Sequence, residues 1–242
     1  MTYFDFLAAL GEGAAHPGGF QSTLQFLQEH PIPKSAQILE IGCGAGRTAC
    51  QLALMGHAVT AIDQSPLMIE KAKARSADLD VHVDFQVMDA SSMTFEDAHF
   101  DLIFVESVTL FMDIPTALKE YNRVLNNGGK LFDRELFLKQ SHPRLPAIMK
   151  KLYGNTAIPS LPEWRQYIES SGFTHVTDWR FSREGKHPLR PDHIHYDQDP
   201  LQRVDSQLFH QPNILEFMQE NQRFYETYWP YLDSAVFISE KP

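Results

Sequence analysis

A glycine-rich segment between a predicted strand and a predicted helix constrains this sequence more than any other feature. Residues 38–46 read Ile-Leu-Glu-Ile-Gly-Cys-Gly-Ala-Gly, and the residues that follow predict a helix over 47–55. Glycine adopts positive φ angles at low cost and lets a ligand approach the backbone closely. A turn of this kind between a strand and a helix brings its ligand to the carboxyl edge of a parallel sheet. We therefore expect a ligand site at this turn.

Strands and helices alternate along the chain on both sides of the turn. The run from Phe100 to Val105 is nearly all apolar, as expected of a strand in the buried centre of a parallel sheet. A Ser-Pro pair at 65–66 and a capping box at 160–163 each predict the start of a helix. The pattern predicts an α/β fold with a doubly wound, seven-stranded, mostly parallel sheet. Its strands are expected at 37–41, 58–62, 83–87, 100–105, 130–136, 175–181 and 235–239.

The full length, residues 1–242, is expected to form a single domain. Residues 1–35 predict interrupted helices that would cap the sheet. Residues 183–233 are expected to form an insertion before the last strand, with an amphipathic helix over 214–228. This insertion has three open interpretations, namely a lid over the ligand site, a dimer surface and a part of the core.

The charge balance limits the classes of partner. The chain has 21 Lys and Arg residues against 31 Asp and Glu residues, so it carries a net charge of −10, which disfavours nucleic acid. No apolar run approaches the roughly 20 residues that a membrane helix needs, so no membrane partner is expected. Only two cysteines, Cys43 and Cys50, are present, and the N-terminus lacks the pattern of a secretory signal. A cytoplasmic location is therefore expected.

The glycine spacing departs from the dinucleotide-binding fingerprint Gly-x-Gly-x-x-Gly. The third glycine, Gly46, comes one residue early, and Arg47 stands where that fingerprint has glycine. Glu40, two residues before the first glycine, is not part of that fingerprint either. An NAD(P)-dependent oxidoreductase is therefore an alternative rather than the preferred interpretation.

Residues 40–46 resemble the first motif of the class I S-adenosylmethionine-dependent methyltransferases, acidic-x-Gly-x-Gly-x-Gly. Further segments resemble that family in the same order, so the match covers roughly residues 37–136. The resemblance implies a Rossmann-like methyltransferase fold, S-adenosyl-L-methionine as cofactor and a small-molecule substrate. The further matching segments are 61–63, 64–68, 88–90, 100–106 and 125–131.

The resemblance also implies roles for individual residues. Asp63 would hold the ribose hydroxyls, Met68 would pack near the adenine, and Asp89 would bind the adenine amine. The chemistry of these residues agrees, because a carboxylate at a strand end can accept hydrogen bonds from a diol or an exocyclic amine. The expected cofactor-binding residues are Glu40, Gly42, Cys43, Gly44, Gly46, Asp63, Gln64, Met68, Asp89, Ala90, Glu106 and Ser107.

Methyl transfer from a sulfonium proceeds by in-line attack of the acceptor, so positioning supplies most of the catalysis. A general base is needed only when the acceptor carries a proton that it cannot otherwise lose. The two catalytic candidates are Glu106, at the end of the central strand, and His16, which could act as a base near neutral pH. Phe20 or Thr23 could line the site beside His16. The acceptor and its reacting atom remain open.

Other functions remain as alternatives. A non-catalytic S-adenosylmethionine-binding regulatory module is compatible with an intact cofactor motif, and so is a protein or RNA methyltransferase. Residues 105–108 read Val-Glu-Ser-Val rather than the Asn/Asp-Pro-Pro-aromatic motif of base-directed enzymes, which disfavours a DNA amine. His193 and His195, with the acidic residues around them, could bind a metal, but they follow no fixed motif and no metal is expected.

Overall fold

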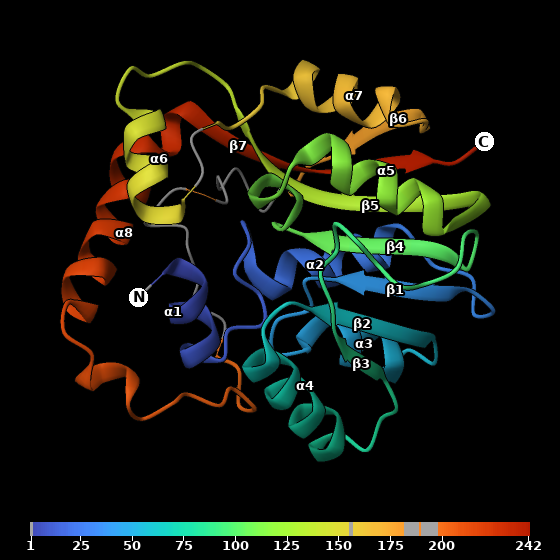
Figure 1. Ribbon diagram of the computed structural model, residues 1–242, viewed down its shortest axis with the longest axis horizontal. Coiled ribbons are helices and arrows are strands. Elements are labelled where there is room, and N and C mark those ends of the chain that lie inside the picture. The colour runs from blue at the N-terminus through green and yellow to red at the C-terminus, as the bar shows by residue number, and fades with distance from the viewer. Residues whose placement is uncertain (1, 155–156, 182–188, 190–197) are drawn as a thin grey trace.

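The computed structural model describes residues 2–154, 157–181, 189 and 198–242. In these residues one seven-stranded sheet has the strand order β3-β2-β1-β4-β5-β7-β6 (Figure 1). Strands β1 to β5 run parallel to one another, and β7 runs antiparallel to both β5 and β6. The predicted seven-stranded, mostly parallel sheet is confirmed. The strands are β1 (Gln37–Ile41), β2 (Ala58–Asp63), β3 (Asp84–Val87), β4 (Phe100–Glu106), β5 (Leu125–Leu138), β6 (Thr174–Trp179) and β7 (Leu232–Glu240).

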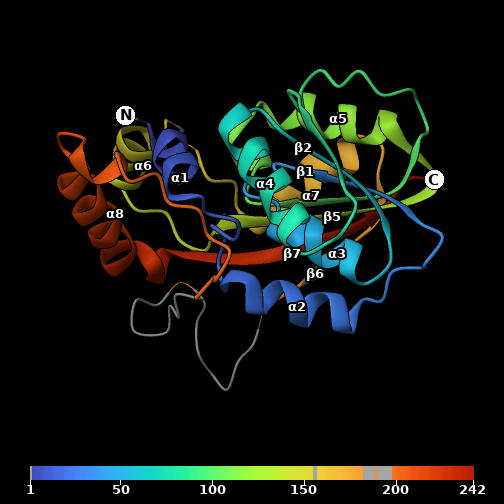
Figure 2. The same cartoon turned by 90° about the horizontal axis from the view of Figure 1, so that it is seen from below.

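Helices cover both faces of the sheet and divide the core in two (Figure 2). On one face, α5 (Ile114–Val124) and α7 (Leu161–Ser170) pack on sheet residues such as Ile103. On the other face, α2 (Gly19–Glu29), α3 (Arg47–Leu54) and α4 (Pro66–Asp78) pack on residues such as Phe104. Successive residues of β4 thus point to opposite cores, as the two-residue period of a strand requires.

Local sequence signals fix where several helices begin. Ser65 accepts a hydrogen bond from the backbone N–H of Met68, and Pro66 occupies the first turn of α4. Ser160 and Glu163 form the predicted capping box at the start of α7. These caps satisfy backbone donors that have no partner inside the helix. The starts of α4 and α7 are therefore well defined.

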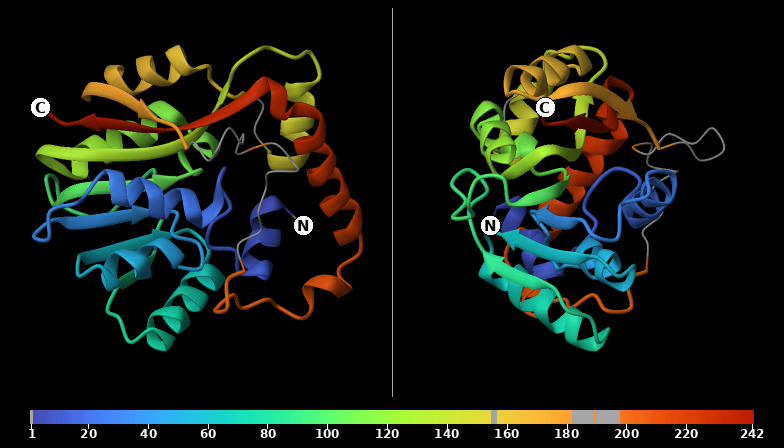
Figure 3. Two further views of the ribbon diagram at one scale, coloured as in Figure 1. Left: turned by 180° about the vertical axis from the view of Figure 1, so that it is seen from behind. Right: turned by 90° about the vertical axis from the view of Figure 1, so that its right-hand side faces the viewer.

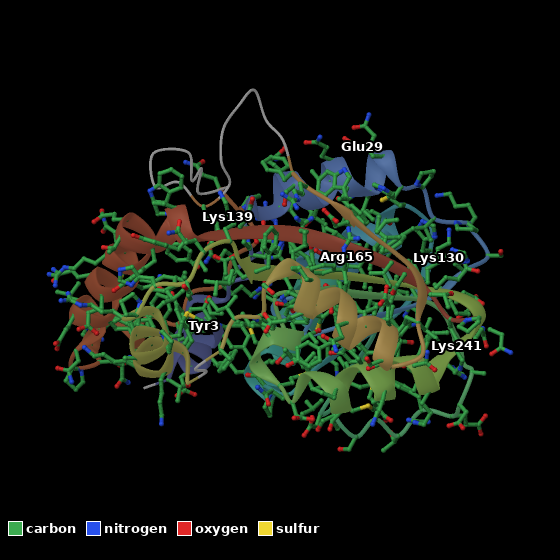
Figure 4. All side chains as sticks on the ribbon, turned by 90° about the horizontal axis from the view of Figure 1, so that it is seen from above. Tyr3, Glu29, Lys130, Lys139, Arg165 and Lys241 are labelled. Carbon is green, nitrogen blue, oxygen red and sulfur yellow. The ribbon has the colours of Figure 1, made fainter. Side chains whose placement is uncertain are left out.

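Three helices gather beyond the carboxyl ends of β1 and β4 (Figures 1 and 3). They are α1 (Tyr3–Leu10), α6 (Leu145–Tyr153) and α8 (Ile214–Tyr228). The ring of Tyr3 contacts Tyr153 of α6 and Phe217 of α8, with centroid distances of 4.8 Å and 6.4 Å. Tyr3 lies beside α6 in Figure 4. This group of helices closes one side of the space in front of the strand ends.

The structure differs from the sequence expectations at two places. Helix α6 was not expected. Pro146 stands in its first turn, but Arg144 before it forms no side-chain cap bond. Strand β5 begins at Leu125 rather than at Lys130, because Leu125 pairs with Phe100. The pairing register then shifts, so residues 126–129 form an irregular extension of the strand instead of a free turn.

The predicted insertion 183–233 falls partly outside the described residues. Residues 182–188 and 190–197, with His193 and His195 among them, belong to the part that is not described. The described part contains η3 (Leu208–His210), the predicted helix α8 and η4 (Trp229–Tyr231). Phe224 and Tyr228 of α8 are buried in the larger core, whereas Leu215 is 67% exposed. Among the described residues, no helix combines the length and hydrophobicity that a bilayer crossing requires.

Candidate active site

A cavity opens at the carboxyl ends of β1, β2 and β4, between the glycine turn and the N-terminal segment. It contains about 1190 Å³ of space free of protein atoms, part of it open to solvent. The strand ends lie at the point where the sheet order reverses, which is where ligands bind in open α/β sheets. The predicted site residues that line this cavity are His16, Glu40, Gly42, Cys43, Gly44, Asp63, Gln64, Met68, Asp89, Ala90, Glu106 and Ser107.

The first two glycines of the turn are required by close contacts with protein. Gly42 has a φ of +69°, and a Cβ atom there would lie 2.2 Å from Cγ2 of Val108. Gly44 has a φ of +52°, and a Cβ atom there would lie 3.0 Å from the carbonyl oxygen of Glu12. The turn is therefore held between the segment after β4 and the N-terminal segment, and both of these segments also line the cavity.

Gly46 is the one predicted cofactor-binding residue that does not line the cavity. It has a φ of +75°, and a Cβ atom there would lie 2.8 Å from the Cβ of Ala72 and 3.0 Å from the ring of Phe85. This glycine lets α3 and the turn pack closely against α4 and β3. Close packing between these elements therefore explains why glycine stands at position 46.

Asp63 ends β2 with both carboxylate oxygens anchored to the backbone. Its Oδ2 accepts a hydrogen bond from the N–H of Gly44 at 3.0 Å, and its Oδ1 accepts one from the N–H of Ser65 at 2.8 Å. Burial raises the pKa of Asp63, and these two hydrogen bonds oppose that shift. A carboxylate oxygen has a second lone pair, so each can accept a further bond from a ribose hydroxyl.

Asp89 lies on the loop after β3 at the exposed rim of the cavity. Its Oδ1 accepts hydrogen bonds from the N–H and the hydroxyl of Ser91, at 2.8 Å and 2.7 Å. These two bonds lower the pKa of Asp89, so the group is ionised near neutral pH. Its second oxygen has no hydrogen bond from the described residues and is suited to an exocyclic amine.

Glu40 is a buried carboxyl group on the cavity wall. It is 5% exposed, and its Oε2 has no hydrogen-bond partner among the described residues. Burial raises its pKa well above the ordinary value, and the nearby carboxylates of Glu106 and Asp63 raise it further. A cationic ligand group next to Oε2 would relieve this cost, because an unpartnered buried acceptor is unfavourable. The site therefore fits a ligand that carries an ammonium or a sulfonium.

Glu106 ends β4 and is the centre of a buried polar network. Its Oε1 accepts hydrogen bonds from Nε of Arg134 at 2.9 Å and from Oγ1 of Thr23 at 2.8 Å, and its Oε2 accepts one from Thr48 at 3.1 Å. Nε2 of His16 lies 3.5 Å from Oε1. Burial would raise the pKa of Glu106, whereas the cationic Arg134 and the hydrogen bonds from Thr23 and Arg134 lower it. The carboxylate is thus ionised, and each of its two oxygens accepts at least one hydrogen bond from protein.

His16 belongs to the same network. Its side chain is only 3% exposed, Nε2 lies 3.2 Å from Oγ1 of Thr23, and Nδ1 lies 3.4 Å from the carbonyl oxygen of Pro17. Burial lowers the pKa of His16 to about 4, so the ring is neutral at pH 7. Both ring nitrogens face protein oxygens, which holds the ring in place. The catalytic role of His16 and Glu106 stays a prediction.

Sequence reasoning missed part of this site. Thr48 and Arg134 complete the Glu106 network from α3 and β5, and no local motif marks them. An apolar wall of the cavity was also not predicted, although the aromatic residues near the N-terminus are visible in the sequence. This wall consists of Tyr3, Phe4, Leu7, Val108, Phe111 and Met112.

Phe20 and Cys43 were also expected near the site, and only Cys43 lines the cavity. Phe20 does not line the cavity and instead packs under Arg47, whose guanidinium lies 4.2 Å from the ring centroid. Cys43 is buried, and burial raises the pKa of its thiol well above the ordinary value, so the thiol is protonated. The described residues contain no group of three or more His, Cys, Asp or Glu side chains placed to hold a metal ion.

Known proteins resemble this chain in sequence and in fold. Residues 39–133 match the family described as a methyltransferase domain. The uncharacterized methyltransferase YodH of Bacillus subtilis is 28% identical over 242 residues, which cover 99% of each chain. Phosphoethanolamine N-methyltransferase 1 of Zea mays is 27% identical over 69% of this chain and 34% of its own length.

A solved structure shares the whole fold. It is Haemonchus contortus phosphoethanolamine N-methyltransferase 2 in complex with phosphomonomethylethanolamine and S-adenosylhomocysteine. The TM-score is 0.75 at 21% sequence identity, and the match covers 100% of this chain and 58% of the other. At this identity the likeness shows that the two proteins have the same fold.

Proposed function

Because this chain is a class I S-adenosylmethionine-dependent methyltransferase, we propose that it transfers the methyl group in line to a small molecule bound in the cavity at the strand ends. The family membership replaces the oxidoreductase alternative. The observation that carries the proposal is the lining of one cavity by Asp63, Asp89 and Glu40, together with the apolar side chains that line the same cavity.

In this proposal three carboxyl groups hold the cofactor. Asp63 accepts hydrogen bonds from the ribose hydroxyls, for which its backbone anchors fix the orientation. Asp89 accepts a hydrogen bond from the adenine amine. Glu40 lies near the cationic end, where its unpartnered Oε2 gains a partner. When bound, S-adenosylmethionine supplies a methyl group that is already activated by its positively charged sulfur.

The Glu106 network forms the floor of the proposed site. Arg134 and Thr48 fix the carboxylate, and His16 is packed between Thr23 and Pro17. A buried ring with a pKa of about 4 is a poor general base near neutral pH. We therefore propose that His16 and Glu106 position the bound molecules. Orientation of this kind is sufficient when the methyl donor is already activated.

Turnover distinguishes this proposal from a non-catalytic binding module. Purified protein would be incubated with S-adenosylmethionine carrying an isotope-labelled methyl group and with a collection of small acceptors. Mass spectrometry would then measure S-adenosylhomocysteine and labelled product. We expect an acceptor that yields both in equal amounts. Tight cofactor binding without labelled product from any acceptor would support the binding module instead.

A further inference from the structure

The part of the cavity beyond the proposed cofactor residues is walled by aromatic rings. Phe4 and Phe111 lie 5.1 Å apart between ring centroids, and Tyr3 lies 5.6 Å from Phe4 and 6.2 Å from Phe111. Val108 and Met112 extend this wall, and Val108 packs directly over Gly42 of the glycine turn. The wall is therefore next to the place where the methyl-bearing end of the cofactor is expected.

The aromatic wall is supported from behind and is open in front. Tyr3 is held by Tyr153 of α6 in an edge-to-face contact at 4.8 Å, and Tyr153 packs in turn on Phe224 of α8. Phe4 is 39% exposed although it lines the cavity, so its ring forms part of the mouth. A preformed apolar surface with an exposed edge is suited to an apolar ligand, which would cover that edge on binding.

The charged groups in the cavity lining are all acidic. Among the described residues, the lining contains no lysine and no arginine, and its single histidine, His16, is neutral at pH 7. A phosphate or carboxylate ligand needs cationic or other strong hydrogen-bond donors to replace its hydration. The acidic lining residues are Glu12, Glu40, Asp63, Asp89 and Glu106.

Two cations close to the cavity are already engaged by protein. Arg134 is buried behind the cavity floor and donates from Nε to Glu106 at 2.9 Å, so its charge is paired, although its Nη2 has no hydrogen-bond partner among the described residues. Lys71 donates from Nζ to the carbonyl oxygens of Ala8 and Ala9, at 2.6 Å and 2.9 Å. Neither residue lines the cavity.

The arginines on α3 and α4 are also engaged. Arg75 forms a two-point ion pair with Asp199, with contacts of 3.1 Å and 2.5 Å. Arg47 lies 3.9 Å from the same carboxylate and over the ring of Phe20. An anionic ligand would have to break one of these pairs to recruit a cation.

Backbone donors of three segments around the cavity are occupied as well. Backbone N–H groups can bind phosphate when several of them point into one site. Here the N–H groups of Gly42 and Cys43 donate to Ile62, that of Gly44 donates to Asp63, and those of Gly13 and Ala14 donate to the Glu12 carboxylate. After β4, the N–H of Ser107 donates to Arg134, and that of Val108 donates to Glu135. These segments therefore form no anion-binding nest.

We infer that the methyl acceptor is a neutral, mainly apolar molecule that binds against the aromatic wall and carries no phosphate group. This inference rests on the proposed function and specifies its substrate class. An apolar acceptor gains stability by covering Phe4 and the adjacent rings, whereas an anionic acceptor would lose its hydration beside five acidic residues.

The test uses two probes that differ only in a phosphate group, 1-naphthol and 1-naphthyl phosphate. Each is titrated calorimetrically into protein saturated with S-adenosylhomocysteine, and phosphoethanolamine is titrated as a third probe. We expect 1-naphthol to bind at least about tenfold more tightly than either phosphate. No binding of 1-naphthol, or equal or tighter binding of a phosphate, would overturn the inference. Failure of S-adenosylhomocysteine itself to bind would overturn the proposed function instead.

Variants connect the result to the aromatic wall. Phe4→Ala should weaken 1-naphthol binding by roughly tenfold and leave the affinity for S-adenosylhomocysteine unchanged. Tyr167→Ala is the matched control, because Tyr167 on α7 is 37% exposed and does not line the cavity. Met112→Lys adds a cation to the wall and should strengthen 1-naphthyl phosphate binding by about tenfold. Equal effects of Phe4→Ala and Tyr167→Ala would place the apolar acceptor elsewhere and overturn the inference.

Discussion

The contact between Gly42 and Val108 gives the sharpest prediction about the architecture of the site. A Cβ atom at Gly42 would lie 2.2 Å from Cγ2, 3.1 Å from Cγ1 and 3.2 Å from Cβ of Val108. Gly42→Ala should therefore force the segment after β4 away from the glycine turn. This segment contains η1 (Thr109–Phe111) and carries part of the aromatic wall.

The expected cost of Gly42→Ala has two parts. A φ of +69° in an alanine costs about 1–2 kcal/mol, and overpacking of a close contact costs about 1–3 kcal/mol. We expect the free energy of unfolding to fall by about 3 kcal/mol in total. Val108→Ala alone should cost about 1 kcal/mol, because it removes two methyl groups from a half-buried site.

Combining the two substitutions separates the steric part from the backbone part. Val108→Ala removes the two atoms nearest to the added Cβ, so the double variant should recover most of the overpacking cost but not the φ cost. A urea-unfolding double-mutant cycle should give a favourable coupling of about 2 kcal/mol. Binding of S-adenosylhomocysteine should recover in parallel. A coupling within about 0.5 kcal/mol of zero would refute this reasoning.

Two further predictions concern the polar groups of the site. Asp63→Ala should weaken S-adenosylhomocysteine binding by about 1–3 kcal/mol in calorimetry. The control Asp84→Ala, at an exposed position on the neighbouring strand, should leave this affinity unchanged. Equal affinities of the two variants for S-adenosylhomocysteine would refute the ribose role of Asp63. Burial lowers the pKa of His16 to about 4 in the folded protein. Between about pH 6.5 and 4 the unfolded chain therefore binds one proton on His16 that the folded protein does not bind. The free energy of unfolding should fall as pH falls through that range, by at most about 3 kcal/mol. His16→Gln should flatten this dependence in urea unfolding at pH 7 and pH 5, and an unchanged slope would show that another group is responsible.

The parts of the site that follow directly after strands could be predicted from the sequence. Asp63 is the last residue of β2 and Asp89 follows β3 by two residues, and parallel strands bring such residues to one edge of the sheet. The glycines of the turn could be located for the same reason. Their closest contacts could not, because Val108 and Glu12 come from segments distant in the chain.

The rest of the site depends on contacts between distant segments. Arg134 reaches Glu106 across the pairing of β5 with β4, and Thr23 reaches it from α2. The aromatic wall combines α1 with η1, and α6, which begins without a side-chain cap bond, supports it. Periodicity and local motifs report only on residues that are close in the sequence, so they contain no information on these contacts between distant segments.

The central claim is that the cavity at the carboxyl ends of β1, β2 and β4 binds S-adenosylmethionine. The most direct test is a calorimetric titration of the purified protein with S-adenosylhomocysteine, with NADH titrated in parallel. We predict saturable one-to-one binding of S-adenosylhomocysteine, weakened by Asp63→Ala, and no heat of binding with NADH. Binding of NADH without binding of S-adenosylhomocysteine would contradict the account.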